Sequence, residues 1–140
     1  RSSGRFSMWQ ALGAPDGVEI VSWNTSALLS SSARLRQRKG EFIGRVGASA
    51  DIICLQEVRP VVGSASRLLK KRFPTKVALL SPHPVSGTCG MVTLISARLA
   101  AKCIVCSSSL VPGRALRVTL VAGEFKLITW NIHSFGLTLR

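Results

Sequence analysis

Early in the sequence, the chain has the pattern of strand, helix and strand, an order that few folds accommodate. Residues 18–23 are rich in β-branched side chains, follow a Pro-Asp-Gly turn, and end at Asn24. Apolar side chains recur at helical spacing in residues 35–46, after three serines that can cap a helix. Residues 51–57 are a continuous apolar run, too short for a helix, with a polar end. We therefore expect two parallel strands in one sheet, joined by a helix.

The polar ends of these strands, Asn24 and Glu57, are predicted to lie at the same edge of that sheet. Each residue alone is weak evidence, because strands commonly end in a turn-forming or polar residue. Together, an amide and a carboxylate at one edge can hold a hard divalent cation and the phosphate that it binds. Mg²⁺ is typically held by one or two carboxylates plus water and substrate oxygens, so a single Glu is enough to begin such a site.

The remainder of the chain predicts a second helix and a series of short strands. Residues 64–73 have helical character and are followed by Pro74. Strand-like runs then follow between Pro and Gly turns, at 76–80, 91–96, 101–107, 116–121 and 125–132. We expect them to form an antiparallel meander that continues the first sheet. The fold class is therefore α/β, with a disordered or extended segment at 1–17 and one domain at 18–140.

The chain is strongly basic, with 19 Lys and Arg against 6 Asp and Glu and a formal net charge of +13. Such a field attracts polyanions, of which nucleic acid and anionic membranes are the common examples. We favour nucleic acid because the basic residues cluster, although each cluster could also be a solvated helix face. The predicted nucleic-acid-binding residues are Arg34, Arg36, Arg38, Lys39, Arg67, Lys70, Lys71 and Arg72. No membrane span is expected, because Arg98 and Lys102 interrupt the most hydrophobic region.

The four cysteines do not favour a zinc site. Cys103 and Cys106 form one C-x-x-C, without a second pair or a nearby histidine. Ordinary thiols in a reducing compartment are the simpler interpretation. Residues 1–10 lack the features of a secretory signal, so we expect an intracellular protein, with the nucleus as one candidate compartment. The initial Arg favours a fragment of a longer protein.

The two histidines differ in context. His133 ends the predicted strand at 125–132, with Asn131 two residues earlier on the same strand face. Without further context, His133 is a half-exposed strand residue. His83 lies between two prolines and is predicted to be a loop residue.

Five segments occur in the order found in the endonuclease/exonuclease/phosphatase superfamily. They are Trp23-Asn24, the run from Asp51 to Leu55-Gln56-Glu57, Ser86-Gly87-Thr88-Cys89-Gly90-Met91, Pro112-Gly113-Arg114 and Asn131-Ile132-His133. The Leu-Gln-Glu motif is the most specific, and five elements in order are far less common by chance than any one of them. From about residue 18 to its last residues, the chain resembles the N-terminal half of this superfamily, of the DNase I-like, retroelement endonuclease type.

This resemblance implies a fold, a reaction and site residues. The fold would be part of a two-sheet αββα sandwich, represented by its first sheet with flanking helices. The reaction would be hydrolysis of phosphodiester or phosphomonoester bonds with Mg²⁺ or Mn²⁺. Glu57 would coordinate the metal, Asn24 would help to bind metal and phosphate, and His133 would hydrogen-bond the scissile phosphate.

The chain also departs from the superfamily pattern. An Asp-x-Asn motif and a terminal Asp-His pair, whose His serves in activating the attacking water, are both missing from the sequence, and Arg140 lies only seven residues after His133. Loss of a general base commonly costs a factor of about 10² to 10⁴ in rate. We therefore expect this isolated chain to be inactive. The second sheet should come mostly from the absent half, a possible partner, which leaves one apolar face of the first sheet bare.

The sequence leaves three functional hypotheses open, beside the alternative of a pseudogene-like fragment with no stable fold and no function. The first is a fragment of a metal-dependent endonuclease that acts on nucleic acid, which the charge favours. The second is a non-catalytic, basic remnant that binds nucleic acid. The third is a phosphatase that acts on inositol phosphates or another phosphoester, because fold and motifs alone do not select a substrate.

Overall fold

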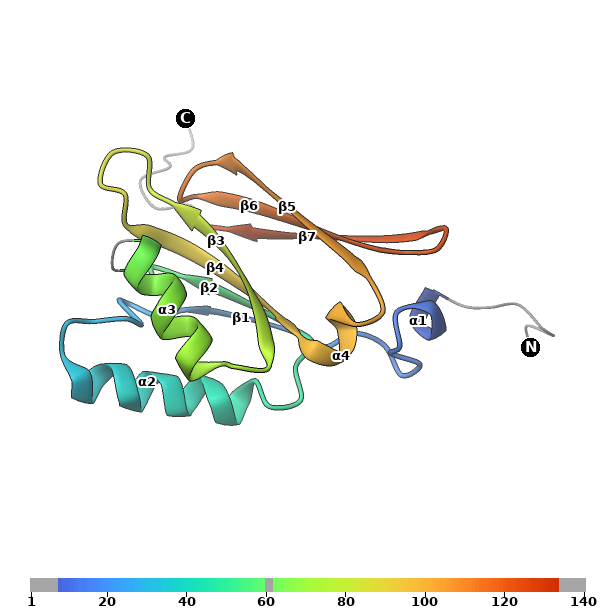
Figure 1. Cartoon of the computed structure of the whole chain (residues 1–140), viewed down its shortest axis with the longest axis horizontal. Coiled ribbons are helices and arrows are strands. Elements are labelled where there is room, and N and C mark those ends of the chain that lie inside the picture. The colour runs from blue at the N-terminus through green and yellow to red at the C-terminus, as the bar shows by residue number, and fades with distance from the viewer. Residues whose placement is uncertain (1–7, 60–61, 134–140) are drawn as a thin grey trace, which may run out of the picture.

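The computed structural model describes residues 8–59 and 62–133, which fold into two packed β-sheets with helices on the outside of one (Figure 1). The elements are α1 Met8–Ala11, β1 Ile20–Asn24, α2 Ala33–Val46, β2 Ile52–Gln56, α3 Val62–Arg72, β3 Lys76–Pro82, β4 Cys89–Ser96, α4 Ala97–Ala100, β5 Ile104–Val111, β6 Ala115–Ala122 and β7 Phe125–Ile132. The chain is thus a mixed α/β protein, as its sequence pattern predicts, and it has two sheets.

The first sheet has the strand order β1-β2-β4-β3. Strands β1 and β2 are parallel, with Asn24 opposite Gln56, and the other two pairs are antiparallel. The predicted strand, helix, strand unit is therefore confirmed, with α2 as its helix. This arrangement places the residues that follow β1 and β2 at one edge of the sheet.

The last three strands form a separate antiparallel sheet of order β5-β6-β7. The prediction that they continue the first sheet is wrong. The short helix α4 redirects the chain after β4; Ser96 caps it, and Leu99 is fully buried. Strand β6 then turns Leu116, Val118 and Leu120 toward the first sheet, and each is at most 1% exposed.

The two sheets pack face to face through a shared apolar core. Leu116, Val118 and Leu120 belong to the same buried cluster as Ile52 and Ile95 of the first sheet. The expectations of a second sheet that comes mostly from an absent half, and of a bare face on the first sheet, are corrected accordingly. The alternating pattern of β6 requires a second apolar face, and this chain supplies that face itself.

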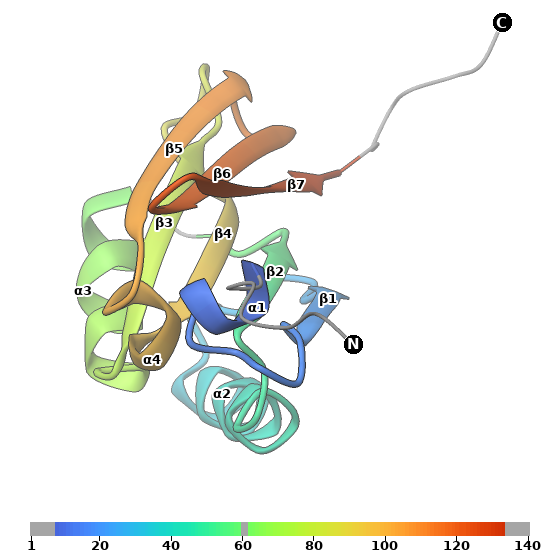
Figure 2. The same ribbon diagram turned by 90° about the vertical axis from the view of Figure 1, so that its right-hand side faces the viewer.

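Helices α2 and α3 cover the other face of the first sheet (Figures 1 and 2). Ser32 caps α2 by accepting a hydrogen bond from the Leu35 backbone N–H, and the cap residue at the other end is Gly47. Ile43 of α2 and Leu69 of α3 are buried against the cluster that contains Leu55 of β2. Burying one such side chain contributes about 1.5–3 kcal/mol. Among the described residues, no helix has the length and apolarity to cross a membrane.

The segment before β1 is ordered where the structure describes it. Helix α1 is followed by Leu12 and Ala14, which are 0% and 1% exposed. Leu12 belongs to the core cluster between the two sheets. Residues 8–17 therefore differ from the disordered or extended segment expected at 1–17, because their apolar side chains pack against that core. Residues 1–7 lie outside the described part of the chain.

Candidate functional site

One pocket lies at the edge where β2, β3 and β7 end and where β4 and β6 begin. Its volume is about 470 Å³. The residues that line it are Glu57, Arg59, His83, Ser86, Thr88, Cys89, Gly90, Gly113, Arg114 and His133. They come from both sheets, so the packing of the two sheets creates the pocket.

Backbone hydrogen bonds tie the segments around this pocket together. The Arg59 N–H donates to the Cys89 carbonyl at 2.7 Å, which joins the end of β2 to the start of β4. The His133 N–H donates to the Arg114 carbonyl at 2.8 Å, which joins the end of β7 to the start of β6. The walls are therefore held in place without any ligand.

The two sheets approach each other closely at Gly90 and Gly113. A β-carbon on Gly90 would lie only 2.8 Å from the Gly113 carbonyl oxygen. Gly113 has a φ of +75°, a conformation that residues with a side chain rarely adopt. Glycine at both positions allows this close approach of the two backbone segments.

The structure brings two predicted site residues, Glu57 and His133, together. His133 Nε2 lies 3.4 Å from Glu57 Oε1, and the two side chains are 20% and 28% exposed. Glu57 directly follows β2 and His133 directly follows β7. A carboxylate and an imidazole side by side in a solvent-accessible pocket can share a proton or bind a polar ligand jointly.

The strand ends beside this pair are conformationally strained. The described non-glycine residues with positive φ are Ser26, Ala27, Glu57 and Arg59, at 46°, 66°, 53° and 48°. All four follow β1 or β2 at the same edge, and the Ala27 N–H donates to the Glu57 carbonyl at 2.7 Å. Backbone strain of this kind costs about 1–3 kcal/mol per residue and concentrates at functional sites.

The third predicted catalytic residue, Asn24, lies at the expected edge but does not line the pocket. Asn24 is exposed, and its Oδ1 accepts a hydrogen bond from the Ser26 N–H at 3.1 Å. This is a turn interaction, one of the two meanings that an Asn at a strand end can have. Its strand neighbour is Gln56, the residue before Glu57.

A second Trp-Asn segment occurs at Trp130-Asn131, and its asparagine has a different role. Asn131 is buried between the sheets at 2% exposure. Its Nδ2 donates to the Leu55 and Val92 carbonyls at 3.2 and 3.0 Å. Its Oδ1 accepts a hydrogen bond from Gln56 Nε2 at 2.7 Å. Asn131 thus joins the two sheets beside the site. Gln56, the residue before Glu57 in the Leu-Gln-Glu motif, is its partner in this connection.

The pocket can contribute part of a metal site. Glu57 is the one carboxylate among the described residues that line it. No group of three or more His, Cys, Asp or Glu in the described ranges could hold a metal. Mg²⁺ and Mn²⁺ accept a single protein carboxylate when water and phosphate oxygens complete the shell, so Glu57 fits such an ion as one ligand.

The pocket thiol, Cys89, is not suited to nucleophilic chemistry. Its side chain is fully buried, and burial raises its pKa to about 12, against a smaller opposing effect of its hydrogen bond to the Met91 carbonyl. A thiol is nucleophilic as the thiolate, so Cys89 stays inert near neutral pH. The chemistry of the pocket therefore rests on Glu57, the histidines and the arginines.

Three of the predicted nucleic-acid-binding residues donate hydrogen bonds to backbone carbonyls of the protein. Lys39 Nζ donates to the carbonyls of Thr25, Ser26 and Ala27, at 2.8 Å for Thr25, and so holds the strained loop after β1. Arg36 Nη1 donates to the Ser30 carbonyl at 2.7 Å. Arg72 Nη2 donates to the Gln37 carbonyl at 2.6 Å and packs over Gly40.

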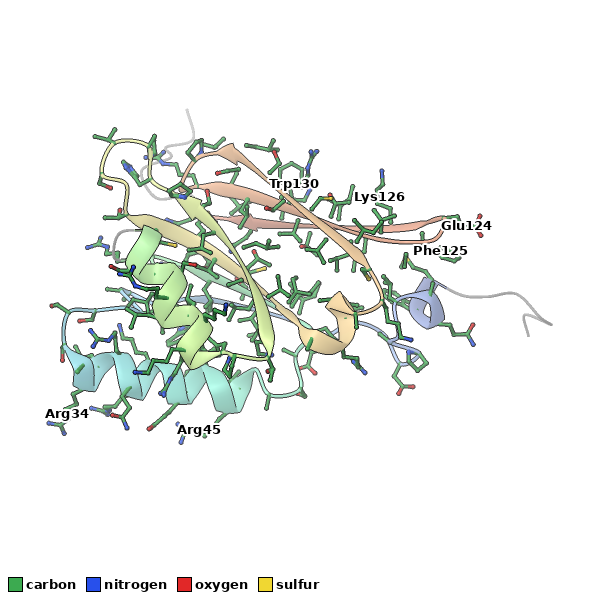
Figure 3. The ribbon with its side chains drawn as sticks, viewed as in Figure 1. Arg34, Arg45, Glu124, Phe125, Lys126 and Trp130 are labelled. Carbon is green, nitrogen blue, oxygen red and sulfur yellow. The ribbon has the colours of Figure 1, made fainter. Side chains whose placement is uncertain are left out.

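The other five predicted nucleic-acid-binding residues of α2 and α3 are exposed: Arg34, Arg38, Arg67, Lys70 and Lys71. Of these, Arg67 Nη2 lies 3.4 Å from Ser64 Oγ. Figure 3 shows Arg34 and Arg45 pointing away from the molecule along α2. These cations lie on the helix-covered face of the first sheet, a different surface from the pocket.

Of the described residues that line the pocket, only Glu57 and His133 were predicted as site residues, and the basic residues that were missed are Arg59, His83 and Arg114. Arg59 comes two positions after Glu57, and Arg114 ends the Pro-Gly-Arg segment, so their proximity to the site motifs was a usable signal. His83 had no such signal. It reaches the pocket because the β3–β4 hairpin folds over the start of β6.

Comparison with solved structures finds distant structural neighbours, whereas the sequence comparisons find no match. No protein-family model matches the sequence, and no curated protein matches it significantly. An endonuclease/exonuclease/phosphatase family protein from Leptotrichia buccalis C-1013-b has a similar structure, with 15% identity and a TM-score of 0.49. The match covers 84% of this chain and 55% of that chain, so this chain spans about half the length of its neighbour. Similarity at this level does not establish membership, and the function has to be argued from the chain's own residues.

Proposed function

We propose that this chain is part of a divalent-metal-dependent phosphodiesterase of the endonuclease/exonuclease/phosphatase type, acting on nucleic acid. The observation that carries the proposal is the pocket at the sheet edge, where Glu57 and His133 lie 3.4 Å apart. These two residues come from separate motifs of the superfamily pattern. Their approach supports the proposal because a chance match of motifs does not require the residues to meet.

The charge of the pocket favours an anionic ligand. Arg59 and Arg114 contribute two permanent positive charges, and Glu57 contributes one negative charge. Guanidinium groups match the geometry of phosphate oxygens and remain charged at all physiological pH values. With neutral histidines the pocket lining is therefore net positive, as a phosphate site should be.

These residue types suit phosphodiester hydrolysis. Negative charge builds on the phosphoryl oxygens as water attacks, and Arg59, Arg114 and His133 are donors that can stabilise it. Glu57 would hold Mg²⁺ or Mn²⁺, which when bound supplies Lewis-acid polarisation of the phosphate and a more acidic water. The backbone at Glu57, with φ of 53°, has a strained conformation of the kind that concentrates at functional sites.

Nucleic acid is the substrate class that the rest of the molecule supports best. The net charge of +13 and the exposed cations of α2 and α3 would attract a long polyanion from several directions. A small phosphoester such as an inositol phosphate would contact the pocket alone. The chain has no Asp-x-Asn and no Asp-His in its 140 residues, so binding without efficient hydrolysis is the activity proposed for it as it stands.

A binding experiment tests this proposal. A fluorescently labelled single-stranded oligonucleotide is titrated with the full chain, first in EDTA and then in Mn²⁺. Arg114→Ala should weaken binding roughly tenfold, because one charge-assisted contact is lost. Arg45→Ala is the control for net charge: Arg45 is an exposed arginine on α2 that does not line the pocket, and the loss of its long-range attraction alone should change affinity less than about twofold.

The Glu57→Gln variant gives the sharpest result. In EDTA it should bind more tightly than the original chain, because a negative charge beside the phosphate is removed. In Mn²⁺ the order should reverse, because the original chain gains a metal-bridged contact that the amide cannot supply. Two outcomes contradict the proposal: inositol phosphates that compete better than DNA, or binding that depends on Arg34, Arg38 and Lys70 but is indifferent to Glu57 and Arg114. The second would indicate binding by the helix face.

A further inference from the structure

The pocket has two groups of hydrogen-bond donors. Gly90 and Gly113, here called the glycine strip, also line it. The first group has His133 and Arg114 as donors, beside the acceptor Glu57, and the His133 N–H donates to the Arg114 carbonyl at 2.8 Å. Gly113 follows, and a β-carbon there would lie 3.2 Å from the Cα of His83. The contacts thus run from His133 through Arg114 and Gly113 to His83.

The volume of the pocket exceeds what one phosphate group occupies. At about 470 Å³ it falls in the range of about 300–1,000 Å³ typical of sites for ligands of drug size. A single phosphate beside His133 would leave the His83 end without a ligand. A ligand that fills the pocket therefore extends from one donor group to the other.

The β3–β4 hairpin that supplies the His83 end is well ordered by its own hydrogen bonds. The His83 N–H donates to the Thr88 carbonyl at 2.7 Å, and the Gly87 N–H donates to the His83 carbonyl at 3.0 Å. Ser86 Oγ and Thr88 Oγ1 are hydrogen-bonded at 2.7 Å. These bonds close the loop around His83 and fix the direction of its ring.

The ring of His83 is held in one tautomer by this loop. Its Nδ1 accepts hydrogen bonds from the backbone N–H groups of Val85 and Ser86, both at 3.3 Å. A nitrogen that accepts carries no proton, so the proton of the neutral ring is on Nε2. Nε2 is thereby available as a donor in a half-buried position on the pocket wall.

We propose that His83, with the Ser86 and Thr88 hydroxyls, forms a second phosphate subsite of this pocket. The ligand class is a nucleotide strand with two consecutive phosphates, one beside His133 and Arg114 and the next beside His83. The glycine strip lets the sugar-phosphate backbone lie close to the protein between them. This inference rests on the proposed function and specifies its ligand as a strand rather than a single phosphate ester.

The test compares one phosphate with two. Thymidine 5′-monophosphate and the 5′-phosphorylated thymidine dinucleotide are titrated into the full chain by calorimetry in EDTA. The original chain should bind the dinucleotide roughly tenfold more tightly, the gain from one added contact to phosphate. His83→Asn should reduce this preference below about twofold and leave the monophosphate affinity unchanged.

The variants separate the two functions of His83. Asn places its oxygen where Nδ1 accepts from the loop, so the hairpin is preserved while the Nε2 donor is lost. His83→Gln places an amide donor near the Nε2 position and should keep part of the preference. Val85→Ala is the control in the same loop, because this side chain is 89% exposed, and it should bind both probes as the original chain does.

Each possible result supports or contradicts a definite claim. Equal binding of both probes by the original chain would overturn the second subsite and leave the proposed function standing. A preference for the dinucleotide that survives in His83→Asn, or an equal loss of affinity for both probes, would also overturn it. Binding of neither probe by the original chain would refute the proposed function and this inference together.

Discussion

The two sheets of this protein differ in how they are covered. The first sheet is covered by helices α2 and α3 on one face and by the second sheet on the other, and all five residues of β2 are buried (Figure 2). The second sheet is buried on its inner face alone. Its outer face carries exposed apolar side chains, namely Ile104, Ile128, Trp130 and Ile132, at 68%, 46%, 48% and 59% exposure.

The two sheets also differ in how much they contribute to the hydrophobic core. The first sheet contributes side chains to both core clusters, whereas the second sheet contributes its inner side chains to one of them. On the outer face, Arg117 lies 5.9 Å above the Trp130 ring, and Figure 3 shows Trp130 and Lys126 along β7. We therefore expect substitutions in the first sheet to act on folding, and substitutions on the outer face of the second sheet to be tolerated.

The largest expected effect compares Leu55→Ala with Ile128→Ala. Leu55 is 0% exposed in β2, and its truncation should reduce the free energy of unfolding by about 2–5 kcal/mol. Ile128 is 46% exposed on β7, and the same kind of truncation should cost less than about 1 kcal/mol. Urea denaturation measures both. Equal losses would mean that the outer face of the second sheet is covered in solution.

An intermediate effect is expected for the two asparagines of the Trp-Asn segments. Asn131→Ala should cost about 1–3 kcal/mol, because its partners Gln56 and the Leu55 carbonyl lose a buried bond between the sheets. Asn24→Ala should cost less than about 1 kcal/mol, because Asn24 is exposed and makes a turn interaction. Thermal unfolding followed by circular dichroism distinguishes them, and a larger loss for Asn24 would reverse these roles.

The smallest effect on stability is expected at the cysteines, which divide between the sheets. Cys54 and Cys89 of the first sheet are 5% and 0% exposed, and burial raises the pKa of both. Cys106 of the second sheet is exposed. A thiol reagent should modify Cys106 in the folded protein and reach the two buried thiols only on unfolding. Cys106→Ser should change stability by less than about 0.5 kcal/mol.

Cys89 should make the free energy of unfolding depend on pH at alkaline values. Its folded pKa is about 12 against an ordinary value of 9.0, so the unfolded chain releases the thiol proton first as pH rises. The contribution of this thiol to folding stability is therefore fully present below pH 9.0 and is lost as the pH rises from 9.0 to about 12. Cys89→Ala should make urea denaturation less sensitive to pH in this window. An unchanged pH profile would show that Cys89 is not the responsible group.

The sequence predicted the first sheet better than the second for a physical reason. Periodicity identifies which side chains are buried, and this was enough for β1, α2 and β2, whose short connections leave one arrangement. Periodicity does not identify which sheet covers a buried face. The alternation of Leu116, Val118 and Leu120 was visible, but the four-residue helix α4 that redirects the chain was not.

The candidate site was predictable where a motif ended a strand. Glu57 was predicted because strand ends meet at sheet edges, and His133 because of the superfamily resemblance; the structure places both in one pocket. Asn24 and Asn131 could not be separated, because both follow Val/Ile-Ser/Thr-Trp and burial depends on the partner sheet. His83 was not predicted, since its position depends on a hairpin that folds over another strand. His83 and His133 are 50 positions apart in sequence and line one pocket only in the tertiary structure.

The left-handed backbone at the ends of β1 and β2 has a consequence for how related sequences should vary. Positive φ is accommodated most readily by Gly, Asn and Asp, so Ser26, Ala27 and Arg59 occupy positions where these residues are favoured replacements. Natural variation at these three positions should drift toward that small set. Position 57 is under the same conformational pressure, and a glutamate retained there across relatives would record selection for its carboxylate.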